Sequence, residues 1–493
     1  MENSNQKQPE VYDSPAPSFF ERLFNSILFK FGVMLILVLF LLIPMEWIND
    51  LIRERRDRER SVSNEIASKW GGPQVISGPI IGIPYTYQYS VKVTDDKGKP
   101  KMETYKEKNY IFLAAKKMKV SSDVEPEYLK RGIYQSVVYK AAITVDGEFD
   151  EIDLSKVAVD PASLHWDEAK LFFGLSDLKG MTAVPKLDWK GTTRDLQMHT
   201  EPISLFERTM SADIGLSEKS TKGTFRMKLD LRGSRTLTVF PTADETMVTV
   251  GGAWNDPSFN GGFLPATREI SQGKFRAAWQ VPSFSRKFPK QWVGLSKELY
   301  MLTDYDGENI GYDQTMPAVT AAPENGSSAQ VSTEQDMVQV NFLEAVNNYQ
   351  KTTRVAKYGA LVILLTFTAL FFTEILKKKK IHFIQYVLIG CAMVLFYSLL
   401  LAIGEHLGFD WSYLLSAVAT IGLITSFIFG ITKDRKICMA FSGVLALFYA
   451  FVYFLMQLQD YALIVGSIGV FVILAVLMRV STRINWYQFD RKS

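Results

Sequence analysis

Residues 27–47 read ILFKFGVMLILVLFLLIPMEW, an apolar run whose charged residues, Lys30 and Glu46, lie near its two ends. A helix of about 20 apolar residues crosses the hydrocarbon core of a bilayer, so this run has the length of a membrane span. A signal peptide would have a shorter leader and a small-x-small cleavage site, whereas 26 residues precede this run and MEWINDLIRER follows its core. We therefore predict an uncleaved signal anchor at 27–47 behind a polar cytoplasmic N-terminus, 1–26.

Five further apolar stretches of similar length follow residue 353. Their expected bounds are 358–376, 384–403, 411–431, 437–456 and 461–480. Together they form a C-terminal membrane domain of five helices, 358–480, followed by a cytoplasmic tail, 481–493. We therefore expect a polytopic α-helical membrane protein with about six transmembrane helices, and we expect it to interact with the lipid bilayer.

The short links between these spans differ in positive charge. Links 377–380 (KKKK) and 433–436 (KDRK) and the segment from Arg479 to the end are basic, whereas links 404–410 and 457–460 contain no lysine or arginine. Because basic residues in short loops stay in the cytoplasm, both termini are predicted to be cytoplasmic and residues 49–353 to lie on the other side of the membrane. The arginines at 53–60 oppose this orientation, but they belong to a loop of about 300 residues, which the rule does not count.

Composition excludes several classes of protein. Of the 493 residues, 47% are hydrophobic and 22% are charged, which excludes a disordered or fibrous chain. The net charge of +3 arises from residues after 353, among the apolar spans, so a soluble enzyme and a nucleic-acid-binding protein both fit poorly. Both cysteines, Cys391 and Cys438, lie there too, so the segment 49–353 has no disulfide framework and no thiolate metal site.

Residues 75–316 are expected to form a β-rich (α+β) external domain between the first and second spans, which the family resemblance described below would place in the periplasm. FRMKLDL at 225–231 alternates apolar and charged residues, as a strand with one buried face does. Shorter alternating segments at 143–145 and 152–154 are separated by Asp146-Gly147, which is typical of a turn. Residues 317–333, PAVTAAPENGSSAQVST, are of low complexity and are interpreted as a flexible insertion.

Two stalks are expected to join this domain to the membrane. The first, 48–74, has arginines and acids at i,i+4 spacing, such as Arg53 and Asp57, which favours a solvated helix ending at Gly71-Gly72-Pro73. The second, 334–357, is expected to be helical from Met337 onward. Alternatively, the arginine-rich part of the first stalk could form a surface that faces anionic lipid or peptidoglycan.

Residues with catalytic chemistry are sparse. The four histidines have no metal-ligand spacing, and the chain lacks H-E-x-x-H, C-x-x-C, G-x-S-x-G and nucleotide-binding glycine motifs. DYDGENIGY at 304–312 lacks the ligand spacing of an EF-hand and is interpreted as a turn. We therefore expect no catalytic residue, no cofactor and no metal. Ionisable residues of the spans lie at the rims, where Glu374 can pair with Lys377 or Lys378, and where Glu405 and His406 face external water.

Several long motifs carry a resemblance to one family. Residues 51–85 contain an arginine-rich helix, then Trp70-Gly71, then G-P-x-x-x-I-P from Gly78 to Pro84. WNDPSFNGGFLP at 254–265 is similar to a signature W-x-x-P-S-F-x-G-x-F-L-P, and RVAKYG, LTFTALFFTEI, IHFIQYVLIG and FYSLLLAIGEHLGF follow in the C-terminal region. In these stretches the chain resembles the CreD inner-membrane, or cell-envelope integrity, proteins of Gram-negative bacteria. The motifs single out, as structural or partner-binding candidates, Trp70, Gly71, Gly78, Pro79, Pro84, Trp254, Pro257, Ser258, Phe259, Gly262, Pro265, Glu374, His382, Gln385, Glu405 and His406.

The resemblance implies an inner-membrane protein linked to a sensor-kinase regulon and to envelope stress or a β-lactam response. It brings no catalytic residues. The WNDPSFNGG cluster is interpreted first as a tight turn in which Trp254 and Phe259 pack beneath the chain, and otherwise as a groove of exposed aromatics for a ligand or partner.

The leading functional hypothesis is a non-enzymatic protein that acts through periplasmic contacts with envelope or cell-wall partners and needs no nucleic acid. One alternative is a transport or channel component, because exporters share a large external domain between their first two spans. Another is a membrane enzyme acting on lipid or wall precursors, which the lack of an acid, base and nucleophile set disfavours. The sequence leaves the oligomeric state open.

Overall fold

The computed structural model describes residues 27–94, 100–200, 205–294, 299, 336–342, 348–377, 381–458 and 461–482. The predicted turn at 304–312 and the predicted insertion at 317–333 lie outside these residues, as do the N-terminus, 1–26, and most of the C-terminal tail. The chain divides into two compact units, one made of Met1–Arg58 with Val346–Ser493 and the other of Glu59–Ala345. We call them the helical unit and the β-rich unit.

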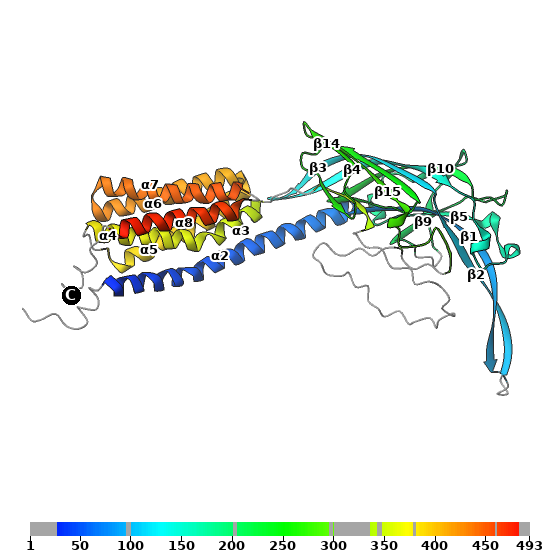
Figure 1. The fold of residues 1–493 in the computed structure, drawn as a ribbon, viewed down its shortest axis with the longest axis horizontal. Helices are drawn as coiled ribbons and strands as arrows, with labels where there is room; N and C mark the ends of the chain where they lie inside the picture. Colours follow the sequence, from blue (N-terminus) through cyan, green and yellow to red (C-terminus); the bar gives the residue numbers. More distant parts are fainter. Residues whose placement is uncertain are drawn as a thin grey trace, which may run out of the picture. The chain divides into compact units, whose positions relative to one another are not determined.

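The helical unit contains the apolar helices (Figure 1). The helices are α2 (Ile27–Trp70), α3 (Asn348–Lys357), α4 (Gly359–Lys377), α5 (Phe383–Leu407), α6 (Phe409–Thr432), α7 (Arg435–Gln457) and α8 (Ala462–Ser481). The part of α2 from Glu59 to Trp70 belongs to the β-rich unit. Within the described residues, five helices are long and apolar enough to cross a membrane, and α3 and α4 together, bent by 41°, can supply a sixth. The apolar helices expected from the sequence are therefore confirmed. The helices α4 to α8 lie within a few residues of their expected bounds, whereas α2 continues without a break from the first expected span to Trp70.

Close approach between helices holds the start of α2 against α4 and α5. A Cβ atom on Gly390 of α5 would lie 2.2 Å from Cδ1 of Leu41, and one on Gly359 of α4 would lie 2.6 Å from Cε of Met45. Small residues at helix contacts permit such approach in membrane proteins, where dispersion contacts replace the hydrophobic effect. The helix α8, in contrast, has no buried residue in its most apolar 18-residue window, as judged from the described chain.

The β-rich unit is built of two sheets. Sheet A has the order β13-β17-β11-β1-β5-β9-β8, with β2 beside β1 and β16 beside β2. Its strands are β1 (Gln74–Thr94), β2 (Pro100–Ala114), β5 (Lys170–Leu175), β8 (Gln197–Met198), β9 (Arg208–Asp213), β11 (Thr236–Phe240), β13 (Ser258–Gly261), β16 (Gln291–Val293) and β17 (Val338–Asn341). Sheet B has the order β14-β15-β12-β3-β4-β10-β6-β7. Its strands are β3 (Lys117–Arg131), β4 (Tyr134–Phe149), β6 (Lys186–Trp189), β7 (Thr192–Asp195), β10 (Gly223–Ser234), β12 (Glu245–Gly252), β14 (Thr267–Ser271) and β15 (Lys274–Pro282).

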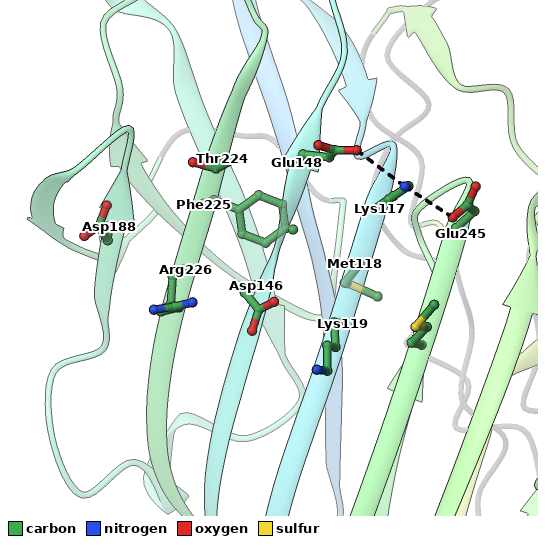
Figure 2. Close-up of a pocket in the computed structure, with 12 residues that line it drawn as sticks. Lys117, Met118, Lys119, Asp146, Glu148, Asp188, Thr224, Phe225, Arg226 and Glu245 are labelled. Atoms are coloured by element: carbon green, nitrogen blue, oxygen red, sulfur yellow. Dashed lines mark ion pairs between the residues drawn. The ribbon is translucent and has the colours of Figure 1, made fainter. Parts of the chain in front are cut away.

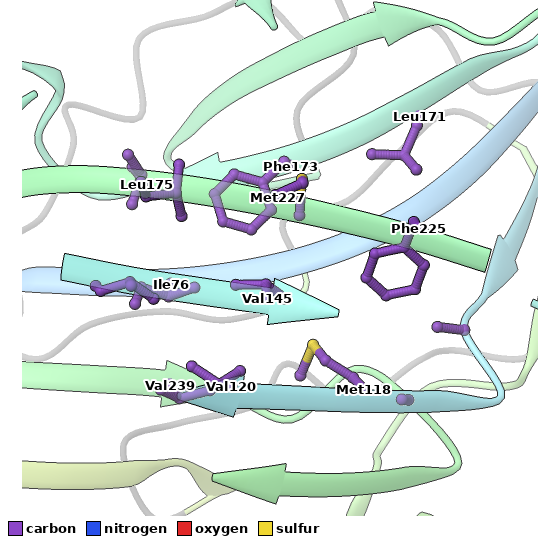
Figure 3. Packing of buried hydrophobic residues seen from close by; sticks show 14 of the residues in the cluster. Ile76, Met118, Val120, Val145, Leu171, Phe173, Leu175, Phe225, Met227 and Val239 are labelled. Atoms are coloured by element: carbon purple, nitrogen blue, oxygen red, sulfur yellow. The ribbon is translucent and has the colours of Figure 1, made fainter. Parts of the chain in front are cut away.

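The main core lies between the two sheets (Figure 3). Ile76 and Phe173 of sheet A and Val145 and Met227 of sheet B are among its buried side chains. The alternation predicted at 225–231 is confirmed, because the apolar residues of β10 are buried and the charged residues between them are exposed. A second, smaller cluster lies on the other side of sheet A and includes Phe172.

Two local predictions are wrong. Asp146-Gly147 is not a turn but lies inside β4, because β4 runs unbroken between β3 and β10. The second stalk is not helical from Met337, because residues 338–341 form β17, which fills the place between β11 and β13 in sheet A. The partners of β17 lie about 80 and 100 residues earlier in the chain, and local sequence cannot show such pairing.

Candidate functional site

The first family motif forms the passage from helix α2 into strand β1. The indole N–H of Trp70 donates to the carbonyl oxygen of Tyr139 at 3.3 Å, and the guanidinium of Arg232 lies 4.6 Å from the centroid of its ring. Gly71 ends the helix with φ at +147°, where a Cβ atom would lie 2.7 Å from the carbonyl oxygen of Arg232. Trp70 and Gly71 therefore fasten the end of α2 to β4 and β10.

A buried glutamine that no motif singled out completes this passage. Gln74 is fully buried, and its side-chain amide donates to the carbonyl oxygens of Asp177, at 3.0 Å, and Arg232, at 3.1 Å. The carboxylate of Asp177 accepts from the backbone N–H of Gly72 at 2.8 Å. The signal in the sequence was a polar residue between a helix-ending Gly-Gly-Pro and an apolar strand, but its partners could not be read from the sequence.

The glycine-proline part of the motif bends β1. The peptide bond between Gly78 and Pro79 is cis, and the register of β1 with β5 shifts between Ser77 and Ile80. Gly78 has φ at +94°, and a Cβ atom there would lie 3.1 Å from the carbonyl oxygen of Phe172. Before Gly78, β1 pairs with β11; after Pro79, β1 pairs with β2.

Pro84 marks the point where β1 leaves the sheet. Its carbonyl oxygen accepts from the backbone N–H of His165 at 2.8 Å, and a ring nitrogen of His165 lies 2.7 Å from the hydroxyl of Thr86. The hydrogen bonds of His165 therefore position the base of the β1–β2 hairpin.

The last turns of α2 are held on the β-rich unit by polar contacts. The side chain of Arg235 donates to Ser63 at 2.9 Å and also to Asn64. Glu65 pairs with Arg131 and, at 2.8 Å, with Lys69. In the preceding turns Arg53 pairs with Glu46 and Asp50 of its own helix instead of with Asp57, the predicted partner. The arginine-rich helix therefore uses some of its charges as fixed structural contacts.

We expect Glu65 to make the β-rich unit sensitive to acid. Hydrogen bonds from Arg131 and Lys69 lower the pKa of Glu65 from 4.5 to about 2. A carboxylate with a lowered folded-state pKa stabilises the fold above its unfolded pKa and loses this contribution as the pH falls. Thermal melts of the full-length protein between pH 5 and about 2 should therefore show a smaller loss of stability for Glu65→Gln than for the wild type, with Glu218→Gln, an exposed acid, as the control. Identical pH profiles for the wild type and Glu65→Gln would contradict this assignment.

The second family motif, 254–265, carries the chain from sheet B to sheet A and back. Phe259 lies on β13, and its ring centroid is 5.6 Å from that of Trp279 and 6.3 Å from that of Phe275. The indole N–H of Trp279 donates to the carbonyl oxygen of Phe263 at 3.0 Å. The ring centroid of Trp254 lies 5.3 Å from that of Tyr128 on β3, with the two rings tilted by 41°. The aromatic side chains of this motif thus pack against the main core.

The polar and small residues of the same motif shape its backbone. Pro257 precedes β13, whose Ser258 hydroxyl donates to Asn260 at 3.0 Å. The backbone N–H of Gly262 donates to the carbonyl oxygen of Met337 at 2.9 Å, which ties the motif to the start of β17. Pro265 is half-buried, next to Leu264, which is 82% exposed. A contiguous groove of exposed aromatics, the other interpretation of this motif, has no support in these contacts.

In the helical unit the candidates occur at two ends of α5. Glu374 of α4 is buried and accepts a hydrogen bond from the hydroxyl of Tyr386 at 3.0 Å. Lys377 and Lys378, its predicted partners, have no described side chains. His382 and Gln385 form a capping box at the start of α5, in which the His382 side chain accepts from Ile384 and the Gln385 side chain accepts from the backbone N–H of His382. These residues terminate and fix helices.

At the other end of α5, Glu405 joins three helices. Its carboxylate lies 3.6 Å from the guanidinium of Arg55 on α2 and 3.4 Å from the hydroxyl of Tyr349 on α3. The prediction that Glu405 only faces water misses both contacts, because α2 and α3 are far from it in the sequence. His406, next in the chain, is exposed as predicted.

A shallow pocket of about 580 Å³ lies on the side of sheet B that faces away from the main core (Figure 2). It is lined by Lys117, Met118, Lys119, Asp146, Gly147, Glu148, Asp188, Thr224, Phe225, Arg226, Glu245 and Met247. Lys117 lies 3.8 Å from Glu148 and 3.9 Å from Glu245, on the two neighbouring strands. Opposite charges alternate across the sheet in this way and stabilise its surface, which leaves little net charge to attract a ligand.

The structure therefore does not bring the candidate residues into one site. The first motif forms the passage from α2 to β1, the second forms the crossing between the sheets, and the others cap or join helices. Within the described ranges, no group of three or more histidine, cysteine, aspartate or glutamate side chains could hold a metal ion.

These features define a membrane protein that combines several apolar helices with a large β-rich unit. The comparisons with known proteins agree with this class. The chain belongs to the CreD family, whose profile, Inner membrane protein CreD, matches residues 26–487. Inner membrane protein CreD of Escherichia coli K12 is 30% identical over 459 residues, which cover 92% of this chain and 92% of that one.

Among solved structures, one match has a low score. An M1 zinc metallopeptidase from Deinococcus radiodurans aligns with 77% of this chain and 93% of its own chain, at 10% identity and a TM-score of 0.18. That score is too low to support an argument about fold or function.

Proposed function

We propose that this protein supports the integrity of the cell envelope through non-catalytic contacts of its β-rich unit with envelope components on the periplasmic side of the inner membrane. The observation that carries the proposal is the alternation of charge between the helix ends. Lys433 lies in the link between α6 and α7, α7 begins with Arg435 and Lys436, and α4 ends at Lys377, the first of four consecutive lysines in the sequence. The links between α5 and α6 and between α7 and α8 contain no lysine or arginine. This pattern favours a cytoplasmic position for the basic links and a periplasmic position for residues 59–345.

The architecture of the β-rich unit also favours a binding role. Its two sheets bury a core that needs no disulfide, and the chain enters it through α2, which continues without a break from the apolar run to Trp70. A large folded unit joined to membrane-spanning helices is suited to contacts with partners of the same compartment. The similarity to Inner membrane protein CreD supports the membrane location.

The orientation can be tested with reporter fusions. A reporter that is active only in the cytosol should be inactive when fused after residue 200, within the β-rich unit, and active when fused after residue 434, between α6 and α7. Activity after residue 200 would overturn the proposed periplasmic position and with it the proposed function.

The contacts can be tested by photo-crosslinking in living cells. A photoreactive residue at Leu264, which is 82% exposed on the β-rich unit, should capture an envelope protein or wall polymer. The same residue at Val418 of α6, 62% exposed within an apolar helix, should capture lipid instead. Conversion of a labelled muropeptide by the purified protein would favour enzymatic function, and a copurifying ATPase would favour transport.

A further inference from the structure

The β1–β2 hairpin extends beyond the sheets of the β-rich unit (Figure 1). The pairing of β1 with β5 ends at Gly82, and the pairing of β2 with β16 ends at Ile111. The hairpin itself continues to the pair of Thr94 with Pro100. In the described part of the chain no third strand pairs with this outer segment. A two-stranded hairpin is at best marginally stable in water, so its side chains must supply the order that a sheet would otherwise give.

Tyrosines line one face of this hairpin. Directly opposite residues in an antiparallel pair share a face, and Tyr89 is directly opposite Tyr105. The ring centroids are 6.1 Å apart between Tyr85 and Tyr87, 5.7 Å between Tyr87 and Tyr89, and 5.8 Å between Tyr89 and Tyr105. We call these four residues the tyrosine ladder. The last two pairs stack with only 26° between their ring planes.

The ladder stabilises the hairpin, but it remains open to solvent. Cross-strand aromatic pairs contribute to the stability of a sheet, which accounts for part of this stacking. Tyr89 and Tyr105 nevertheless remain 41% and 43% exposed. Tyr85, at the base, is buried in the main core, but from Tyr87 outward the row of partly exposed aromatic rings is a surface on which another flat apolar face can stack.

Two carboxylates flank the rings on the same face. The hydroxyl of Tyr87 donates to Glu107 at 2.7 Å, and the hydroxyl of Tyr105 donates to Glu103 at 2.9 Å. Hydrogen bonds from Tyr105 and then from Lys101 lower the pKa of Glu103, so this carboxylate stays ionised. A carboxylate has about four acceptor positions, so both glutamates can accept further hydrogen bonds beside the rings.

This chemistry disfavours two other occupants. Insertion of the ladder into a bilayer would carry Glu103 and Glu107 towards hydrocarbon, which is costly for ionised groups. Addition of a partner strand to the hairpin edge is disfavoured by exposed lysines along it, such as Lys92 and Lys106, because charged edge residues hinder edge-to-edge pairing. On the ladder face the two glutamates outnumber Lys101, which pairs with Glu103 at 3.2 Å, so this face offers no net positive charge to attract anionic groups.

We propose that the tyrosine ladder binds an uncharged linear polysaccharide. The C–H faces of its pyranose rings would stack on Tyr89 and Tyr105, while its hydroxyl and amide N–H groups would donate to Glu103 and Glu107. The inference rests on the proposed function, because it names a class of envelope component that the β-rich unit contacts.

The test measures binding of chitohexaose, a β-1,4-linked oligomer of N-acetylglucosamine, to the full-length protein in detergent by isothermal titration calorimetry. The double variant Tyr89→Ala/Tyr105→Ala should bind about tenfold more weakly or worse, as expected for the loss of two stacking rings. The variant Tyr89→Phe/Tyr105→Phe keeps the rings and should bind within about threefold of the wild type. Ser90→Ala/Thr104→Ala changes the neighbouring pair, which lies on the other face of the hairpin, and should leave binding unchanged.

A second variant keeps the test informative if the alanine substitutions cause the hairpin to misfold. Glu103→Gln/Glu107→Gln preserves side-chain shape but replaces each carboxylate with a weaker acceptor, so binding should weaken by about threefold or more. The proposal is overturned if the wild type fails to bind chitohexaose, if the Ser90→Ala/Thr104→Ala control loses binding equally, or if the ladder variants lose only binding to phosphatidylethanolamine–phosphatidylglycerol vesicles. Failure of chitohexaose to bind, with crosslinks still captured from Leu264, would overturn the ladder assignment and leave the proposed function standing.

Discussion

Replacing Gly147 with alanine is expected to lower the free energy of unfolding of the β-rich unit by about 3 kcal/mol or more. Gly147 lies in β4, opposite Met118 of β3 on one side and Phe225 of β10 on the other. A Cβ atom there would lie 1.9 Å from the carbonyl oxygen of Lys117 and 2.8 Å from Cζ of Phe225. The nearer atom belongs to the backbone, so the clash can be relieved only by moving β3 or β4.

The expected loss is large because β4 cannot move by itself. Twelve register pairs hold it to β10 and fifteen hold it to β3, and the ring of Phe225 packs in the main core beside it (Figure 3). A shift of the backbone at one position therefore disturbs two neighbouring strands and the packing beneath them.

A matched glycine on the same sheet provides the control. Gly251 lies in β12, and a Cβ atom there would be 3.4 Å from its nearest neighbour, an ordinary van der Waals contact. Urea titration of the full-length protein in detergent, followed by the tryptophan fluorescence of the β-rich unit, should show a large loss of stability for Gly147→Ala and a small change for Gly251→Ala. Equal effects in the two variants would contradict the steric argument.

Gly147 also shows the limit of what the sequence could predict. Aspartate followed by glycine is a common turn signal, and residues 143–145 and 152–154 on either side alternate apolar and polar side chains, so the turn prediction followed local rules. The actual reason for the glycine is the carbonyl group of Lys117, about 30 residues away in the chain. No local pattern contains that neighbour.

The elements that were predicted correctly depend on periodicity or length alone. The span expected at 411–431 is helix α6, Phe409–Thr432, because hydrocarbon thickness determines how many apolar residues a span needs. The strand at 225–231 was predictable because one of its faces is buried and the other is exposed. In both cases the environment acts on consecutive residues, so its effect is visible in the local sequence.

The candidate site was less predictable because its partners are distant in the chain. Trp70 and Gly71 were singled out by the motif, but the groups that hold them, Tyr139 and Arg232, were not. Arg235 is a similar case, since this residue has φ at +60° and carries the chain from β10 in sheet B to β11 in sheet A. A positive φ at an arginine is imposed by tertiary structure and has no signal in residue type.

Replacing Asp244 with alanine is expected to destabilise the β-rich unit by about 3 kcal/mol, because it leaves a buried guanidinium without its counter-charge. The side chain of Arg286 is only 7% exposed and lies 3.0 Å from one carboxylate oxygen of Asp244. The other oxygen lies 2.8 Å from Lys290, which also pairs with Asp150 at 3.2 Å. Burial lowers the pKa of Arg286, but the guanidinium stays charged at neutral pH, so it cannot avoid the loss by releasing its proton.

The cost of the single substitution should exceed that of removing both charges. Arg286→Met replaces the guanidinium with an apolar side chain of similar length, so the double variant Asp244→Ala/Arg286→Met leaves no unpaired charge at this place. In the wild type, Arg286 also donates hydrogen bonds to the carbonyl oxygens of Thr242 and Phe288. These two acceptors lose their donor in the double variant, which therefore remains less stable than the wild type.

The double-mutant cycle, measured by urea titration, should therefore give a coupling energy of about 1 kcal/mol or more between Asp244 and Arg286. Asp213→Ala is the matched control, because this carboxylate is 76% exposed and lies 3.5 Å from Lys170, an ion pair of the kind that contributes little. If Asp244→Ala destabilised the unit no more than Asp213→Ala does, the ion pair of Asp244 with Arg286 would contribute no more than an exposed ion pair, and the argument from burial would be wrong. The large expected difference follows from solvent access: water compensates the lysine that loses Asp213, whereas little water reaches the guanidinium that loses Asp244.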